Sequence, residues 1–135
     1  MRYAVCAIMV RDSDRQREVL LGRRASHRRS YAGCRDVPGG HVEPGESVAD
    51  ALARELREEL GVTPVASTYL TTLSVPDSAS GDIPCYDLYL VTEWAGVPMM
   101  RNDEHDDLRW LALDEAAVLP GLALEAYREI FASLP

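Results

Sequence analysis

The chain has 135 residues, of which 47% are hydrophobic and 27% are charged, and its formal net charge is −8 at pH 7. This length suits one domain with a sizeable core, so we expect residues 1–135 to form a single domain. The composition is that of a globular protein, and no apolar run reaches the length of a membrane span. We therefore expect a cytoplasmic protein with no membrane partner.

The charge pattern excludes several classes of function. An acidic chain lacks the basic surface of a sequence-independent nucleic-acid binder, so we expect no nucleic-acid partner. All 14 basic residues are arginine, which excludes mechanisms that need a phosphate-loop or Schiff-base lysine. Three widely spaced cysteines indicate neither a disulfide framework nor a zinc site. These features predict a small-molecule partner and a monomer or homodimer.

The first predicted elements are two strands. The apolar run Tyr3–Val10 is typical of a strand buried on both faces. A second strand over residues 19–24 ends in Arg23 and Arg24, whose side chains must point to opposite faces. One of the two arginines can therefore face a pocket and bind a phosphate, and the alternative is that both are surface charges.

A basic loop then leads into a short strand. Arg28 and Arg29 lie in this loop and are either a patch that steers a charged substrate or plain solvated charge. The short strand over residues 36–40 ends in Gly39 and Gly40. Two glycines permit unusual backbone angles and let a backbone carbonyl approach a ligand closely.

A loop and helix follow. Ser47 and Asp50 resemble a capping box, and Gly61 is placed to end the helix in a left-handed conformation, so we predict a helix over residues 47–60. At about 100° per residue, one stripe of this helix is apolar and a second face carries three glutamates. The apolar stripe consists of Ala49, Leu52, Ala53, Leu56 and Leu60, and the glutamates are Glu55, Glu58 and Glu59.

The three glutamates repel one another unless a positive charge lies between them. A hard divalent cation such as Mg²⁺ or Mn²⁺ would supply that charge, because both ions bind carboxylate and carbonyl oxygens. The alternative is a solvated acidic face, which is the usual meaning of a run of charges.

The rest of the chain alternates between strand and helix patterns. Residues 67–75 and 85–94 are β-rich and predict a hairpin, whose Tyr86, Tyr89 and Trp94 either stack on a base or pack in the core. An acidic loop precedes a predicted strand over residues 108–111, and helical patterns follow at 114–117 and 122–134. Strands alternating with helices predict an α/β fold in which a mixed sheet is sandwiched between helices.

One spacing is far more specific than the rest. Gly40, five residues, Glu46, seven residues and then Arg54-Glu55-Leu56-Arg57-Glu58-Glu59-Leu60-Gly61-Val62 resembles the signature of the Nudix hydrolases at every defined position. The resemblance implies the Nudix fold, which agrees with the α/β/α sandwich predicted from the alternating elements. It also implies a metal-dependent pyrophosphohydrolase of the MutT-like kind, with Mg²⁺ as the cofactor and Mn²⁺ as the alternative.

The resemblance also implies roles for individual residues. Expected metal ligands are the Gly39 carbonyl, Glu55, Glu58, Glu59 and Glu104, and expected catalytic residues are Glu58, Glu59, Glu104 and Arg54. Gly40, Glu46 and Gly61 are expected to support the motif, and substrate binding is expected at Arg24 more than at Arg23. Glu104 is chosen from the acidic loop because its place six residues before Trp110 resembles the downstream glutamate of MutT-like enzymes, with Asp103 and Asp106 as alternatives.

The predicted reaction is cleavage of a nucleoside diphosphate linked to a further group. A compact chain without a second motif favours a nucleoside triphosphate, oxidised or not, as the substrate, with monophosphate and pyrophosphate as products. The alternatives are a pyrophosphatase for ADP-ribose or another nucleotide sugar, and a nucleotide-binding module without turnover. A serine hydrolase is disfavoured, because in Gly45-Glu46-Ser47-Val48-Ala49 an alanine replaces the second glycine of a nucleophile elbow.

Overall fold

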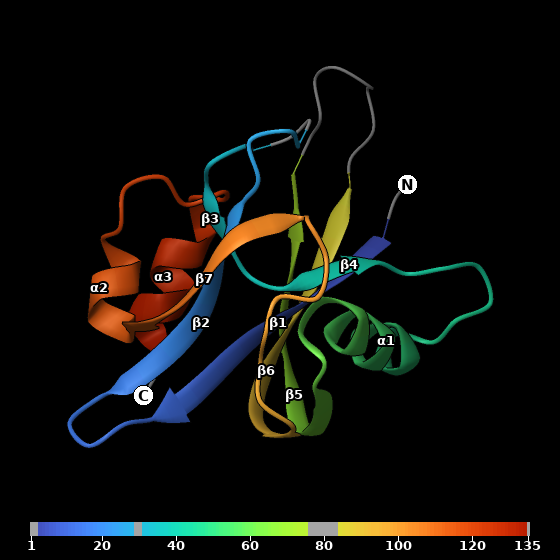
Figure 1. Ribbon diagram of the computed structural model, residues 1–135, viewed down its shortest axis with the longest axis horizontal. Helices are drawn as coiled ribbons and strands as arrows, with labels where there is room; N and C mark the ends of the chain where they lie inside the picture. Colours follow the sequence, from blue (N-terminus) through green and yellow to red (C-terminus); the bar gives the residue numbers. More distant parts are fainter. Residues whose placement is uncertain (1–2, 29–30, 76–83, 135) are drawn as a thin grey trace.

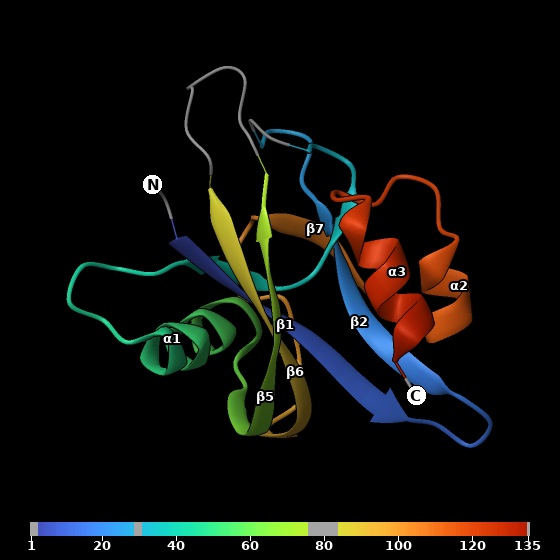
Figure 2. The same cartoon turned by 180° about the vertical axis from the view of Figure 1, so that it is seen from behind.

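The computed structural model describes residues 3–28, 31–75 and 84–134 and shows a mixed β-sheet between helices (Figure 1). The strands are β1 (Tyr3–Asp12), β2 (Arg17–Arg24), β3 (Arg35–Asp36), β4 (Gly39–His41), β5 (Thr63–Ser74), β6 (Cys85–Ala95) and β7 (His105–Ala112). The helices are α1 (Val48–Leu60), α2 (Leu113–Ala117) and α3 (Ala126–Ser133). Seen from the front and from behind, α1 covers one side of the sheet and α2 with α3 the other (Figures 1 and 2). The predicted α/β fold is confirmed.

Strand β1 is the centre of the sheet. It pairs in parallel with β6, in register from Tyr3 opposite Cys85 to Met9 opposite Val91. Its other edge pairs antiparallel with β4 near its start and with β2 near its end. Strand β5 pairs antiparallel with β6, and β2 also pairs with β3 and β7. The loop that holds Gly39 and Gly40 is therefore fixed to the central strand.

Alternation along β1 divides the core into two clusters. Cys6, Ile8 and Val10 face α2 and α3, and the cluster on that side includes Tyr127 and Phe131. Val5, Ala7 and Met9 face α1, and the cluster there includes Leu52, Leu56 and Leu60 of the predicted apolar stripe. The small members of the stripe are wrong, since Ala51 is buried in the cluster while Ala49 is exposed. Successive side chains of a strand point to opposite faces, so a strand that is apolar throughout can support helices on both sides.

The ends of α1 are formed as the sequence predicts. The Ser47 hydroxyl accepts a hydrogen bond from the Asp50 backbone N–H, and the helix ends at Gly61 with φ of 71°. The loop before β7 also closes this end of the helix, since the N–H of Met99 donates to Leu60 O at 3.0 Å and that of Arg101 donates to Glu59 O at 2.8 Å. Both contacts satisfy carbonyls that a helix terminus otherwise leaves unpaired.

Several boundaries differ from the sequence-based expectation. Strand β5 begins at Thr63 instead of residue 67, and the strand predicted over residues 36–40 is the two strands β3 and β4. The terminal helix begins at Ala126 instead of residue 122, because the backbone of residues 121–123 runs beside β3 and exchanges hydrogen bonds with Arg35. Strand β7 begins at His105 instead of residue 108, because β2 pairs with it as far as Arg24. Among the described residues, no helix is long and apolar enough to cross a membrane.

Candidate active site

A pocket of about 550 Å³ opens between the acidic face of α1 and the end of the sheet nearest β3 and β4. Its lining comes from β1, β2 and the loop after it, the β3–β4 segment, α1, β6, the loop before β7, the start of β7 and α3. The polar residues that line it are Arg24, Arg28, Tyr31, Asp36, His41, Glu43, Arg54, Glu55, Glu58, Glu59, Tyr86, Glu104, His105 and Tyr127. All three motif glutamates and Glu104 thus share one pocket, although Glu104 is far from the helix in sequence.

Arg54 organises the entrance on the helix side. Its Nε and Nη2 donate to the two carboxylate oxygens of Glu46 at 2.7 and 2.9 Å. Its Nη1 donates to Glu55 at 2.9 Å and to Glu58 at 3.3 Å, and its Nη2 also donates to the His41 carbonyl at 2.9 Å. The hydrogen bonds from Arg54 lower the pKa of Glu46 to about 2. A planar guanidinium can hold several acceptors in fixed directions, so Arg54 orients the carboxylates around it.

Buried Glu59 and partly exposed Glu104 form a carboxylate pair. The Glu59 side chain belongs to a residue only 3% exposed, and its Oε2 accepts the Gly39 N–H at 3.0 Å. Burial and the hydrogen bond with Glu104 raise the pKa of Glu59 well above the usual range of a glutamate. The same hydrogen bond lowers the pKa of Glu104. Two carboxylates that share a hydrogen bond must also share a proton, so this pair carries one negative charge without a cation.

Glu55 lies against the backbone of the glycine pair. A Cβ atom on Gly40 would overlap the carboxylate of Glu55, so a side chain at this position would displace it. Burial raises the pKa of Glu55, and its hydrogen bond from Arg54 opposes that rise. The Gly40 position therefore needs glycine for space, not for its backbone angles.

The donor set of this wall suits a hard divalent cation. Glu55, Glu59 and Glu104 supply carboxylate oxygens, and the Gly39–Gly40 backbone lies beside them, which is the ligand chemistry that Mg²⁺ and Mn²⁺ prefer. Within the described ranges, no three acidic, histidine or cysteine side chains already converge as a ready-made metal centre. A cation bound here would replace the proton that Glu59 and Glu104 share. The side chain of Glu58 is 56% exposed and lies at the rim.

The two arginines at the end of β2 have different surroundings. Arg24 lines the pocket, and its Nη1 donates to Asp36 Oδ2 at 3.2 Å. Arg23 is not part of the pocket lining, and its Nε donates to Asp106 at 2.7 Å on the surface. Arg24 therefore faces the pocket while Arg23 faces the surface, which favours Arg24 over Arg23 as a substrate contact.

Several pocket residues were not predicted from the sequence as site residues, among them Asp36, His105 and Tyr127. Asp36 and Tyr127 join through a hydrogen bond of 2.7 Å from the tyrosine hydroxyl, across 91 positions of sequence. Arg28, one of the two arginines of the basic loop, has its Nη1 at 3.6 Å from Glu104. The His105 ring packs against Gly22, where a Cβ would lie 2.6 Å from it. No local pattern could have identified Asp36 or Tyr127, because the contact between them joins residues that are 91 positions apart in the sequence.

Comparisons with known proteins place this site in context. The sequence model of the NUDIX domain matches residues 1–134. The chain is 35% identical to a CTP pyrophosphohydrolase of Escherichia coli (strain K12), with 100% of this chain and 97% of that protein covered. It is 33% identical to a nucleoside triphosphatase NudI of Salmonella newport, with 87% and 86% covered. Among solved structures, a MutT NUDIX hydrolase from Burkholderia pseudomallei has a TM-score of 0.84 at 33% identity, with 99% and 98% covered.

The shared proton predicts how the stability of the metal-free protein depends on pH. Because the folded pKa of Glu59 is raised, the folded state binds more protons than the unfolded state above about pH 4.5, so stability falls as pH rises from there. The pKa of Glu104 is lowered, so its protonation changes stability only at lower pH.

We expect the difference in unfolding free energy between Glu59→Gln and wild type to change in favour of the variant by up to about 1 kcal/mol for each pH unit from pH 5 to 8. Urea unfolding in EDTA measures this, with exposed Glu58→Gln as the matched control; parallel pH curves for wild type and Glu59→Gln would contradict the assignment.

The contact at Gly40 predicts a defect in cation binding. Gly40→Ala places a methyl group where the Glu55 carboxylate lies, so we expect the Mg²⁺ concentration for half-maximal turnover to rise at least about ten-fold. Gly45→Ala is the control for backbone strain without displacement of a carboxylate, because φ of Gly45 is 78° and nothing lies within 4 Å of a Cβ there. An unchanged Mg²⁺ requirement in Gly40→Ala, measured by titration of activity, would show that Glu55 has no part in binding the ion.

Proposed function

This chain belongs to the Nudix hydrolase family, and from that premise we propose that it is a divalent-cation-dependent pyrophosphohydrolase that converts a nucleoside triphosphate to monophosphate and pyrophosphate. The observation that carries the proposal is the pair of buried Glu59 and partly exposed Glu104, with Glu55 on the same wall of a pocket that Arg24 also lines. Two relatives, a CTP pyrophosphohydrolase and a nucleoside triphosphatase, support a triphosphate substrate.

The reaction adds one water across a phosphoanhydride. A bond forms between the water oxygen and a phosphorus atom, the bond from that phosphorus to the bridging oxygen breaks, and one water proton must leave. We propose that Glu55, Glu59 and Glu104, with Glu58 at the rim and the Gly39 carbonyl, hold Mg²⁺ or Mn²⁺. When bound, the ion offsets the phosphate charge and makes water more acidic.

Four side chains of the protein have the remaining roles in the proposed reaction. Glu104 approaches from a different element than α1, and Arg28 lies 3.6 Å from its carboxylate, so we assign it the acceptance of the water proton. Arg54 fixes the orientation of Glu55 and Glu58 through its hydrogen bonds. Arg24 supplies positive charge on the pocket wall for the bound nucleotide. Arg28 lies beside Glu104 and adds to that charge.

A substrate screen tests the proposed reaction. We expect pyrophosphate release from one or more nucleoside triphosphates with Mg²⁺, and loss of that release in EDTA. The panel contains the common ribo- and deoxynucleoside triphosphates, an oxidised guanine nucleotide and ADP-ribose, and ion chromatography identifies the products. Turnover of ADP-ribose alone would move the enzyme to the nucleotide-sugar class, and no turnover of any compound would favour a binding module.

Glu104→Gln tests the residue proposed to accept the proton. We expect kcat to fall at least about ten-fold while KM changes little, because the amide keeps the shape and cannot take a proton. Asp103→Asn is the matched control, since Asp103 is an exposed neighbour in the same loop and is absent from the pocket lining. Full activity in Glu104→Gln would transfer this role to a motif glutamate, with Glu58 as the next candidate.

A further inference from the structure

The pocket lining includes residues that the proposed hydrolysis does not use. Among them are Cys6 of β1, Tyr86 of β6, and Leu124 and Tyr127 at the α3 side. These are apolar or aromatic surfaces of the kind that accept a flat ring. One charged acceptor lies among them, the carboxylate of Asp36.

The hydrogen bonds of Asp36 leave part of its capacity unused. Its Oδ1 accepts the Val37 N–H at 2.8 Å and the Tyr127 hydroxyl at 2.7 Å, which fills both lone pairs of that oxygen. Its Oδ2 accepts Arg24 Nη1 at 3.2 Å. The side chain is 14% exposed. Oδ2 therefore retains one acceptor position, and three donors from three elements fix its direction.

The place of Asp36 relative to the reacting groups suits a nucleobase. Asp36 is three residues from Gly39, whose N–H binds Glu59, and three residues span at most roughly 10 Å. A nucleotide whose phosphates lie at Glu59 would extend its sugar and base along this short segment. A carboxylate repels a phosphate, so the ligand group at Asp36 must be a hydrogen-bond donor instead of a second anion.

We propose that Asp36 selects nucleobases that present an exocyclic amino group, as cytosine and adenine do. This inference rests on the proposed function, because it concerns the base of the same nucleotide. An amino N–H donates to Asp36 Oδ2, whereas the carbonyl of uracil or hypoxanthine at that position faces a carboxylate with no proton between them. A site built to pair with a donor rejects the analogue that lacks it, because its buried acceptor is then left unpaired.

Two matched substrate pairs test the selection in the wild-type enzyme. CTP and UTP differ in an amino group against a carbonyl at one ring position, and ATP and ITP differ in the same way. We expect kcat/KM to favour the amino member by about ten-fold or more in whichever pair is hydrolysed faster. Equal values, or a preference for the carbonyl member, would overturn the inference while leaving a triphosphate hydrolase intact. Absence of pyrophosphate release from every nucleotide would instead overturn the proposed function.

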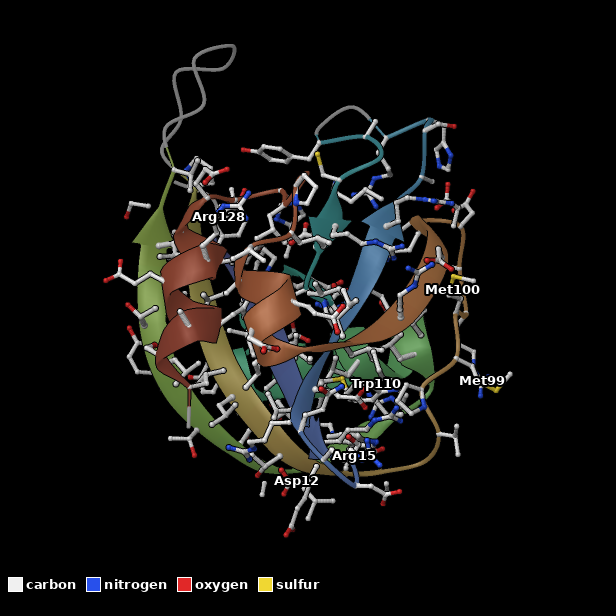
Figure 3. The ribbon with its side chains drawn as sticks, turned by 90° about the vertical axis from the view of Figure 1, so that its left-hand side faces the viewer. Asp12, Arg15, Met99, Met100, Trp110 and Arg128 are labelled. Atoms are coloured by element: carbon white, nitrogen blue, oxygen red, sulfur yellow. The ribbon has the colours of Figure 1, made fainter. Side chains whose placement is uncertain are left out.

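Substitutions at Asp36 assign the selection to this residue. We expect Asp36→Asn to reduce the amino-to-carbonyl ratio to about one or to invert it, because the amide N–H₂ can donate to a carbonyl. Loss of the contact between Asp36 and Arg24 would lower kcat/KM for all nucleotides alike. The amino-to-carbonyl ratio of kcat/KM would not change for that reason, so this ratio reports base selection alone. Asp12→Asn is the matched control, since Asp12 pairs with Arg17 at 3.0 Å on the β1–β2 hairpin, at the end of β2 away from Arg24 (Figure 3).

A second variant keeps the test decisive if Asp36→Asn does not fold. Asp36→Glu keeps the charge and moves the carboxylate by one methylene, so we expect it to retain turnover and lose most of the ratio. If both variants are folded by circular dichroism and either keeps the full wild-type ratio, Asp36 does not select the base. If Asp36→Asn fails to fold, the wild-type ratios together with Asp36→Glu decide the question.

Discussion

The repulsion among carboxylates on one wall of the pocket is the constraint on which the site depends. Glu59 is buried, and its nearest acidic partner, Glu104, is held close enough to share a hydrogen bond. Neighbouring carboxylates that are shielded from water cannot all stay ionised, because their negative charges repel one another. The cluster must therefore hold either a proton or a cation. A divalent ion satisfies more oxygens than one proton can, which makes cation binding and ionisation of the cluster a single event.

The fold supplies the rigidity that keeps these groups together. Arg54 binds Glu46, Glu55 and Glu58 from the helix side. The loop after β6, where Figure 3 shows Met99 and Met100, is hydrogen-bonded to the last carbonyls of α1, and the Glu104 carbonyl accepts the Ala25 N–H of the segment after β2. Glu104 is thus fixed to the same helix that carries Glu59 and to the sheet beside it. Because repulsion would separate unrestrained side chains, this backbone attachment makes the close pair possible.

The sequence predicts those parts of the site that depend on local structure. The helix, its Ser47 cap and its Gly61 end follow from residues within a few positions of one another. The seven-stranded sheet and the Glu59–Glu104 contact depend on pairings between distant segments, and only the family resemblance indicated the second. The start of α3 was predicted four residues too early, because pairing of residues 121–123 with β3 overrides their helical spacing. The sequence indicates only that Asp36 belongs to a strand, because its hydrogen-bond partner Tyr127 lies far away in the sequence, on α3.

Asp36 and Glu59 show how surroundings decide what a buried carboxylate can do. Burial raises the pKa of both groups. At Asp36 the rise is opposed by hydrogen bonds from Tyr127 and Val37 and by the charge of Arg24, so the group can remain an anion that accepts hydrogen bonds. At Glu59 only the Gly39 N–H opposes it, and the neighbouring acids increase it. The first carboxylate is already compensated by the protein and is suited to recognition. The second lacks compensation and is suited to binding a cation, so one pocket can use the same functional group for both tasks.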